Sequence, residues 1–164
     1  MRAVIVYFSM SGRTKKIAEI LGKSLSNYNV DYVSLVLTGG FFTKIDKLDK
    51  FEHQNFTLVE NELNTLEKQQ ADLFLIGMPT YGGIPPKIFE EILRRMPYLA
   101  GKKIVTFSTS WGSKEGAALP MKTRIAQLGG QIIESKNFQG FFHVNTSDAE
   151  KFGQKINELI MLHP

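Results

Sequence analysis

Near the start of the chain, three hydroxyl side chains are spaced so that they could bind a ligand together. They lie in the segment Ser9-Met10-Ser11-Gly12-Arg13-Thr14, called here the first loop. It follows the apolar, β-branched run 3–8 and precedes a helical pattern, so its backbone amides would open a helix. Such amides are unpaired and carry partial positive charge, which suits a phosphate. Gly12 allows close approach or a positive φ, and Arg13 could add charge. The spacing predicts an anion site, with the alternative that Ser11 simply caps the helix.

The first loop lacks three better-known motifs. The Walker A pattern is absent, and so is the Rossmann Gly-x-Gly-x-x-Gly, whose absence argues against a dinucleotide as the main cofactor. The hydrolase pattern Gly-x-Ser-x-Gly lacks its first glycine. The hydroxyl groups are therefore interpreted as donors to an anion rather than as nucleophiles.

Two later loops each combine an aromatic residue with small and polar neighbours. The second loop, Pro79-Thr80-Tyr81-Gly82-Gly83, follows an apolar run at 73–77, and the third loop, Ser108-Thr109-Ser110-Trp111-Gly112, follows a run at 103–108. Tyr81 and Trp111 are candidates to stack on a planar ligand. Each loop also has a purely structural interpretation. The second loop would then be a tight connection with Tyr81 packed on the surface, and in the third loop Trp111 would fold back on the sheet as a core anchor.

The hydrophobic pattern predicts the elements that would position these loops. Apolar runs predict five strands, at 3–8, 30–36, 73–77, 103–108 and within 131–144. Helical spacing follows the first loop, recurs at 87–96 and up to about Leu128, and ends the chain at 149–160. Residues 41–70 are charged and rich in Asn and Gln, and predict one helix at about 59–69 with irregular surface elsewhere.

This order predicts an α/β fold, a single domain over 1–164 with a parallel sheet covered on both faces. Ligands of such sheets bind beyond the carboxyl ends of the strands. All three loops follow strands, so they should meet at that edge.

Composition excludes several classes of function. The 164-residue chain has no cysteine, so disulfides, thiolate metal sites and thiol redox chemistry are excluded, and redox chemistry would need a bound cofactor. Its three histidines, His53, His143 and His163, show no ligand spacing, so no metal site is expected. The net charge is +4, but no basic block with interleaved aromatic residues indicates nucleic-acid binding. No apolar run predicts a signal peptide or membrane insertion, and a cytoplasmic location is expected.

At the level of motifs, the chain resembles the flavodoxins. The first loop is similar to their phosphate loop, Ser/Thr-x-Ser/Thr-Gly-x-Thr, at all four specified positions, Ser9, Ser11, Gly12 and Thr14. The second and third loops resemble the two loops that surround the flavin ring in that family. In element order the resemblance covers nearly the whole chain, with 41–70 the least defined part.

The resemblance implies a three-layer flavodoxin-like sandwich with strand order 2-1-3-4-5 and non-covalently bound FMN. The first loop would bind the phosphate, while Thr80 to Gly83 and Thr109 to Gly112 would line the flavin ring. Tyr81 and Trp111 would lie on its two faces, and a backbone group near Gly82 would contact flavin N5. The implied cofactor-binding residues are Ser9, Met10, Ser11, Gly12, Arg13, Thr14, Pro79, Thr80, Tyr81, Gly82, Gly83, Ser108, Thr109, Ser110, Trp111 and Gly112.

Three functions are compatible with the sequence. The first is a low-potential electron carrier that serves a redox partner protein or a small-molecule donor or acceptor. The second is an FMN-dependent NAD(P)H oxidoreductase with a quinone or similar acceptor, and the third is a non-redox phosphate-ligand binder or hydrolase on the same fold. Small size favours the first. Carrier flavodoxins are typically acidic, so the basic charge, with Lys114, Lys87, Arg94 and Arg95 near the second and third loops, favours the second.

Overall fold

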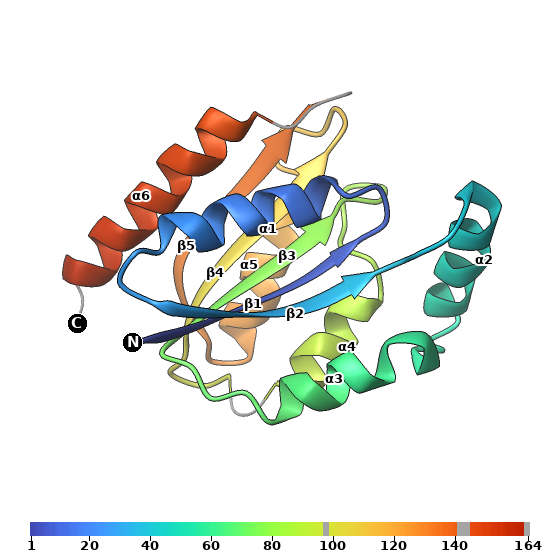
Figure 1. Ribbon diagram of the computed structural model, residues 1–164, viewed down its shortest axis with the longest axis horizontal. Coiled ribbons are helices and arrows are strands. Elements are labelled where there is room, and N and C mark those ends of the chain that lie inside the picture. The colour runs from blue at the N-terminus through green and yellow to red at the C-terminus, as the bar shows by residue number, and fades with distance from the viewer. Residues whose placement is uncertain (97–98, 141–144, 163–164) are drawn as a thin grey trace.

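One parallel sheet organises the chain, with the strand order β2-β1-β3-β4-β5 (Figure 1). The computed structural model describes residues 1–96, 99–140 and 145–162. Its strands are β1 (Arg2–Ser9), β2 (Asn29–Val36), β3 (Leu73–Pro79), β4 (Lys103–Ser110) and β5 (Gln131–Gln139). The expected α/β class and strand order are confirmed. The last strand was predicted within 131–144, of which 141–144 lie outside the described residues.

The central strands are apolar because both of their faces are covered. In β1, the side chains from Ala3 to Phe8 are all buried, as expected for a parallel strand packed on both sides. The edge strand β5 is mostly half-buried, which fits its mixture of polar and apolar residues. The apolar runs in the sequence therefore located the inner strands well.

Two layers of helices enclose the sheet (Figure 1). The helices are α1 (Arg13–Ser24), α2 (Phe41–Glu52), α3 (Glu60–Glu67), α4 (Ile88–Arg95), α5 (Ala118–Gln127) and α6 (Thr146–Leu162). Helices α1 and α6 pack on one face, with Leu21 and Phe152 in the same core cluster as Ile5. Helices α3, α4 and α5 pack on the other, where Leu63 and Ile92 join Val6. This is the predicted three-layer arrangement.

The segment 41–70 corrects the prediction of irregular surface around one helix. It contains α2 as well as α3, which a short 3₁₀ turn at Thr57–Val59 precedes. Helix α2 stands beyond the end of β2 (Figure 1) and anchors itself through Phe51, whose ring centroid lies 5.5 Å from that of Phe8. Its sequence does carry apolar residues at helical spacing, namely Ile45, Leu48 and Phe51, between charged ones. The prediction overlooked this pattern because it judged the segment by its charged and amide-rich composition.

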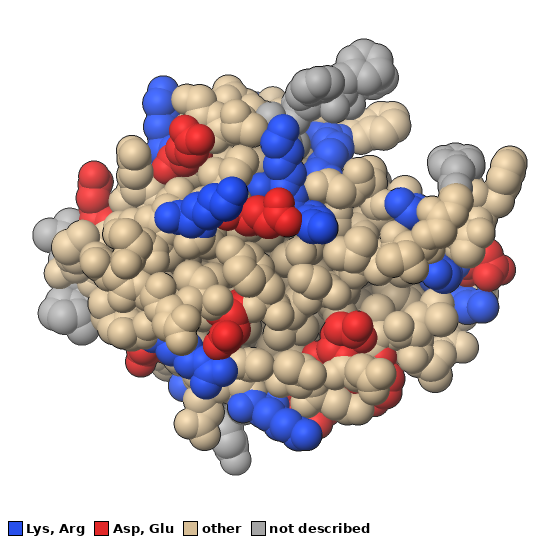
Figure 2. Space-filling view, viewed as in Figure 1, with Lys and Arg blue, Asp and Glu red and all other residues tan. Residues whose placement is uncertain are grey.

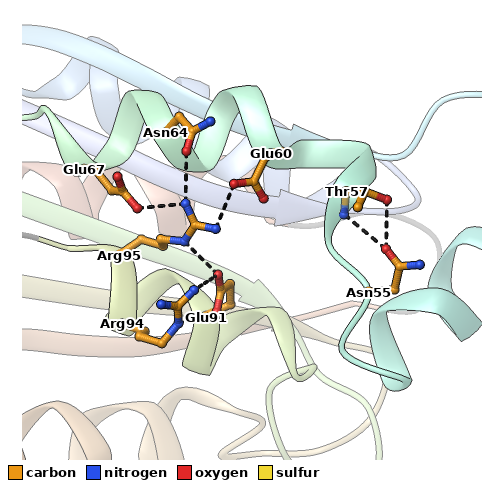
Figure 3. A network of polar contacts seen from close by, with 8 residues as sticks. All are labelled: Asn55, Thr57, Glu60, Asn64, Glu67, Glu91, Arg94 and Arg95. Carbon is orange, nitrogen blue, oxygen red and sulfur yellow. Dashed lines mark hydrogen bonds and ion pairs between the residues drawn. The ribbon is translucent and has the colours of Figure 1, made fainter.

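Helices α3 and α4 are tied together by Arg95 (Figure 3). Its guanidinium group donates to Glu91 on its own helix and to three side chains of α3, those of Glu60, Asn64 and Glu67. The Arg95 side chain is only 14% exposed. Its charge is therefore neutralised within the fold and contributes little to the open basic surface that the sequence suggested.

In the part of the chain that the structure describes, no helix is both long enough and apolar enough to span a membrane.

Candidate cofactor-binding site

The first loop connects β1 to α1 through a glycine in a left-handed conformation. Gly12 has φ 87° and lies at the N-cap of α1, whose first helical hydrogen bond runs from the Lys16 N–H to the Gly12 carbonyl, 2.9 Å. The Gly12 N–H donates to Ser9 Oγ at 3.1 Å, while Ser11 is exposed. Among the described residues no side chain caps α1, so the interpretation of Ser11 as a cap is wrong. The amides of the first helical turn therefore have no acceptor within the helix.

The open space at this loop is shown by Gly12 itself. A Cβ built on it would meet no described atom within 4 Å. A side chain there would stand in the loop's opening and would also carry the strain of a positive φ. The glycine therefore leaves room for a group that approaches the backbone.

Thr14 joins the first loop to the end of β4. Its Oγ1 lies 2.9 Å from Thr109 Oγ1, and both side chains are buried. The Thr109 carbonyl also accepts from the Thr80 N–H at 2.9 Å, at the start of the second loop. The three loops are thus bonded to one another at a single edge of the sheet, as the sequence predicted.

Arg13 reaches away from the first loop to two strand ends. Its Nη2 donates to the carbonyl of Ser110, 2.8 Å away, and to that of Gly140 after β5. Burial lowers the pKa of the Arg13 guanidinium. Its Nε is buried without a hydrogen-bond partner, and no carboxylate lies in ion-pair range within the described part of the chain. The partners of this cation are neutral, so its charge is uncompensated.

The second loop turns back on itself at two glycines. Tyr81 and Ile84 exchange backbone hydrogen bonds of 3.0 and 3.2 Å, and between them Gly82 and Gly83 have φ 59° and 86°. Two successive positive φ angles are those of a type I′ turn, which glycine adopts without strain. Pro79, which precedes the loop's turn, is the last residue of β3.

Tyr81 links the second loop to the first. Its half-buried ring packs against the apolar core, and its hydroxyl donates to the Met10 Sδ at 3.9 Å. Burial, with a smaller contribution from the charge of Glu52, raises the pKa of Tyr81 to about 12. A neutral phenol therefore lies beside the first loop at any physiological pH.

The third loop is ordered by Asn137 of β5, a residue that sequence reasoning missed. Ser108 Oγ donates to Asn137 Oδ1 at 2.7 Å, and Asn137 Nδ2 donates to Ser110 Oγ and to the Ser113 carbonyl, each at 2.8 Å. A Cβ on Gly116 would lie 2.3 Å from Asn137 Oδ1, so only glycine allows this approach. The available signal was a polar residue in a strand, paired in register with Ser108.

Trp111 and Gly112 form the exposed tip of the third loop. Trp111 is 66% exposed, so its interpretation as a core anchor is wrong. Thr80 lies beneath this loop, where its Oγ1 accepts from the Ala117 N–H at 2.9 Å, just before α5 begins. The tip thus presents an aromatic side chain on a base fixed by hydrogen bonds, and stacking of Trp111 and Tyr81 on a ligand stays a prediction.

Two hollows of the surface lie away from the three loops. One of about 790 Å³ is lined by residues of α4, α5 and the segment after α2, and one of about 470 Å³ lies at the amino ends of the strands. Neither is lined by a residue of the three loops. The candidate site therefore rests on the geometry of the loops and not on either hollow. The described residues include no group of three or more metal-ligating side chains; His143 and His163 lie outside them.

Comparison with known proteins gives a consistent structural result. No protein-family model and no curated protein matches the chain in sequence. Among solved structures, a flavodoxin from the domain Archaea matches with a TM-score of 0.65 and 18% identity, covering 98% of this chain and 99% of its own. This chain has the flavodoxin-like fold. A WrbA-like flavodoxin protein from Agrobacterium tumefaciens matches with a TM-score of 0.62 and 18% identity over 99% of each chain.

A third match with this fold is a flavoprotein from Lactobacillus acidophilus whose structure contains FMN. It has a TM-score of 0.55 and 22% identity, covering 83% of this chain and 92% of its own. In the flavodoxin-like fold the strand order reverses beside β1, so the loops after β1, β3 and β4 meet at one edge. The three loops of this chain occupy those positions.

Proposed function

We propose that the chain binds FMN non-covalently at the three loops and carries electrons to and from a redox partner. The observation that supports this most directly is the first loop, where α1 begins without a side-chain cap, Ser11 is exposed and the space beside Gly12 holds no described atom within 4 Å of a Cβ position. The Lactobacillus acidophilus protein of similar fold was solved in complex with FMN. Phosphates bind favourably at helix N-termini because the amides supply both donors and partial positive charge.

The remaining residues fit the same group. The buried Nε of Arg13 lacks a partner, and the positions of a Cβ on Gly82 and Gly83 meet no described atom within 4 Å. Tyr81 and Trp111 offer aromatic faces for the ring, and a backbone group at Gly82 would contact N5. When bound, FMN supplies one- and two-electron chemistry, while the chain binds it, orients it and tunes its potential.

The shape of the loop edge supports the carrier role. Ile84 is 60% and Trp111 66% exposed, so apolar side chains rim the site and can be covered by a partner protein. The net charge stays +4, but three of the cations near the second and third loops are paired. Lys87 Nζ lies 3.8 Å from Glu52 Oε2, and Arg94 and Arg95 both pair with Glu91. These pairs weaken the main objection to a carrier.

A second candidate is an FMN-dependent NAD(P)H oxidoreductase with a quinone or similar acceptor. The net charge of +4 supports it, as does the exposed Lys114 next to the tip of the third loop, because a cation there would attract an anionic co-substrate.

The test is a titration of the purified chain with FMN, followed by visible absorbance and flavin fluorescence, then reduction with dithionite. We expect stoichiometric uptake with perturbed flavin bands and reversible bleaching. A chain that takes up no FMN contradicts both flavin functions and leaves the non-redox phosphate binder. If the FMN-loaded chain oxidises NAD(P)H at steady state in the presence of a quinone, the oxidoreductase function replaces the carrier function as the proposal.

A further inference from the structure

Helix α2 delivers a lysine to the first loop from outside its motif. Lys44 Nζ donates to the Met10 carbonyl at 2.9 Å, and its side chain is half-buried. The motif Ser-x-Ser-Gly-x-Thr does not include Lys44, because α1 and β2 lie between the first loop and α2 in the sequence. Figure 2 shows basic side chains over both α1 and α2, on either side of the first loop.

The charge of Lys44 has no counter-ion in the described structure. Of the three lysines of α2, Lys50 pairs with Asp46 at 3.4 Å, whereas Lys44 has no carboxylate in ion-pair range within that part of the chain. An ammonium group has three N–H donors, and the Met10 carbonyl uses one of them. Lys44 therefore places a positive charge without a carboxylate partner at the first loop, where an anion would be stabilised.

We propose that Lys44 is a specificity-determining residue that makes this site prefer a phosphorylated over an unphosphorylated flavin. This inference rests on the proposed FMN function and adds a cation that the phosphate-loop pattern does not contain. FMN and riboflavin share the ring and differ in the phosphate, which is close to a dianion at neutral pH. A side chain that acts on the phosphate changes the affinity for FMN alone, whereas one that only positions the loop changes both.

Lys47 is a matched control on the same helix. Its Nζ also donates to a backbone carbonyl, that of Thr38 at 2.7 Å, and it too has no carboxylate partner among the described residues. Thr38 follows β2 and is not part of the first loop. The two lysines thus share helix, charge and type of bond and differ in the loop that they reach.

The experiment measures dissociation constants for FMN and for riboflavin with the wild type, Lys44→Gln, Lys44→Arg and Lys47→Gln. We expect Lys44→Gln to weaken FMN binding roughly five- to twentyfold, the size of one charge-assisted contact, and riboflavin binding by less than about twofold. Lys44→Arg should retain most of the FMN affinity, and Lys47→Gln should change neither constant by more than about twofold. Added salt should reduce the difference in FMN affinity between the wild type and Lys44→Gln, because salt screens the partly exposed charge of Lys44.

Equal losses for FMN and riboflavin in Lys44→Gln, or no loss for either, would overturn the proposal while leaving FMN binding intact. If the wild type binds no FMN, the proposed function fails, and inorganic phosphate becomes the probe. Thermal unfolding with and without phosphate should then show stabilisation of the wild type that Lys44→Gln loses. An equal response of both proteins to phosphate would overturn the role of Lys44 as well.

Discussion

Arg13, the first residue of α1, donates from its Nη2 to the carbonyl of Ser110, the last residue of β4, across 2.8 Å. The bond joins residues 97 positions apart in the sequence and fastens the first loop to the third. A second bond, to the Gly140 carbonyl, adds the end of β5. The first loop is thereby fixed to the loop that carries Trp111.

Replacing Arg13 should therefore weaken the fold as well as the site. In Arg13→Met the stem can still pack, but the two carbonyls lose a charged donor, and we expect the free energy of unfolding to fall by about 1–3 kcal/mol. Urea unfolding without cofactor measures this. The control is Lys15→Met, an exposed residue that lies 3.8 Å from Glu19, for which we expect less than about 0.5 kcal/mol. Equal free energies of unfolding for Arg13→Met and the wild type would contradict a stabilising role for the two hydrogen bonds of Arg13.

The pair Thr14 and Thr109 should behave as a coupled unit. Thr14→Val or Thr109→Val leaves the other buried hydroxyl without its partner at 2.9 Å, which should cost about 1–3 kcal/mol. The double variant removes both polar groups and should cost less than the sum of the single changes. A double-mutant cycle by chemical denaturation checks this, with the exposed Thr123→Val as control. Strict additivity would contradict the coupling.

The type I′ turn makes Gly82 difficult to replace. Gly82→Ala forces a Cβ into φ 59° and should lower stability by about 1 kcal/mol, whereas Gly82→Asn should lose less, because asparagine tolerates positive φ. Thermal unfolding measures both variants, and Gly112→Ala is the control at a glycine without positive φ and with open space around it. Unchanged one- and two-electron reduction in Gly82→Ala would argue against a backbone contact from Gly82 to flavin N5.

The raised pKa of Tyr81 should appear as a pH dependence of stability. Its phenol ionises near pH 10 in the unfolded chain but only at about 12 in the fold, so the folded state holds more protons between these values. The free energy of unfolding should therefore fall as the pH rises from about 10 towards 12, and more steeply for the wild type than for Tyr81→Phe. Denaturation at pH 8, 10 and 11 measures the slopes, and parallel curves would contradict the prediction.

The sequence alone determined the sheet, its order of elements and the place of the three loops. These follow from local patterns: buried parallel strands need continuous apolar runs, and a loop that opens a helix needs small and hydroxyl residues at fixed spacing. The sequence could predict Ser9, Gly12 and Thr14 as phosphate-loop residues because they lie within one short segment.

The tertiary structure decided which side chains meet across the sheet. The contacts of Arg13 with Ser110, of Asn137 with Ser108 and of Lys44 with Met10 depend on strand register and on where α2 packs against the end of the sheet, and no local pattern gives either. The outward position of Trp111 was also undecided by local pattern, because a single aromatic residue in a polar loop can fold either way. Long-range packing selects among such options, and a one-dimensional pattern does not contain that information.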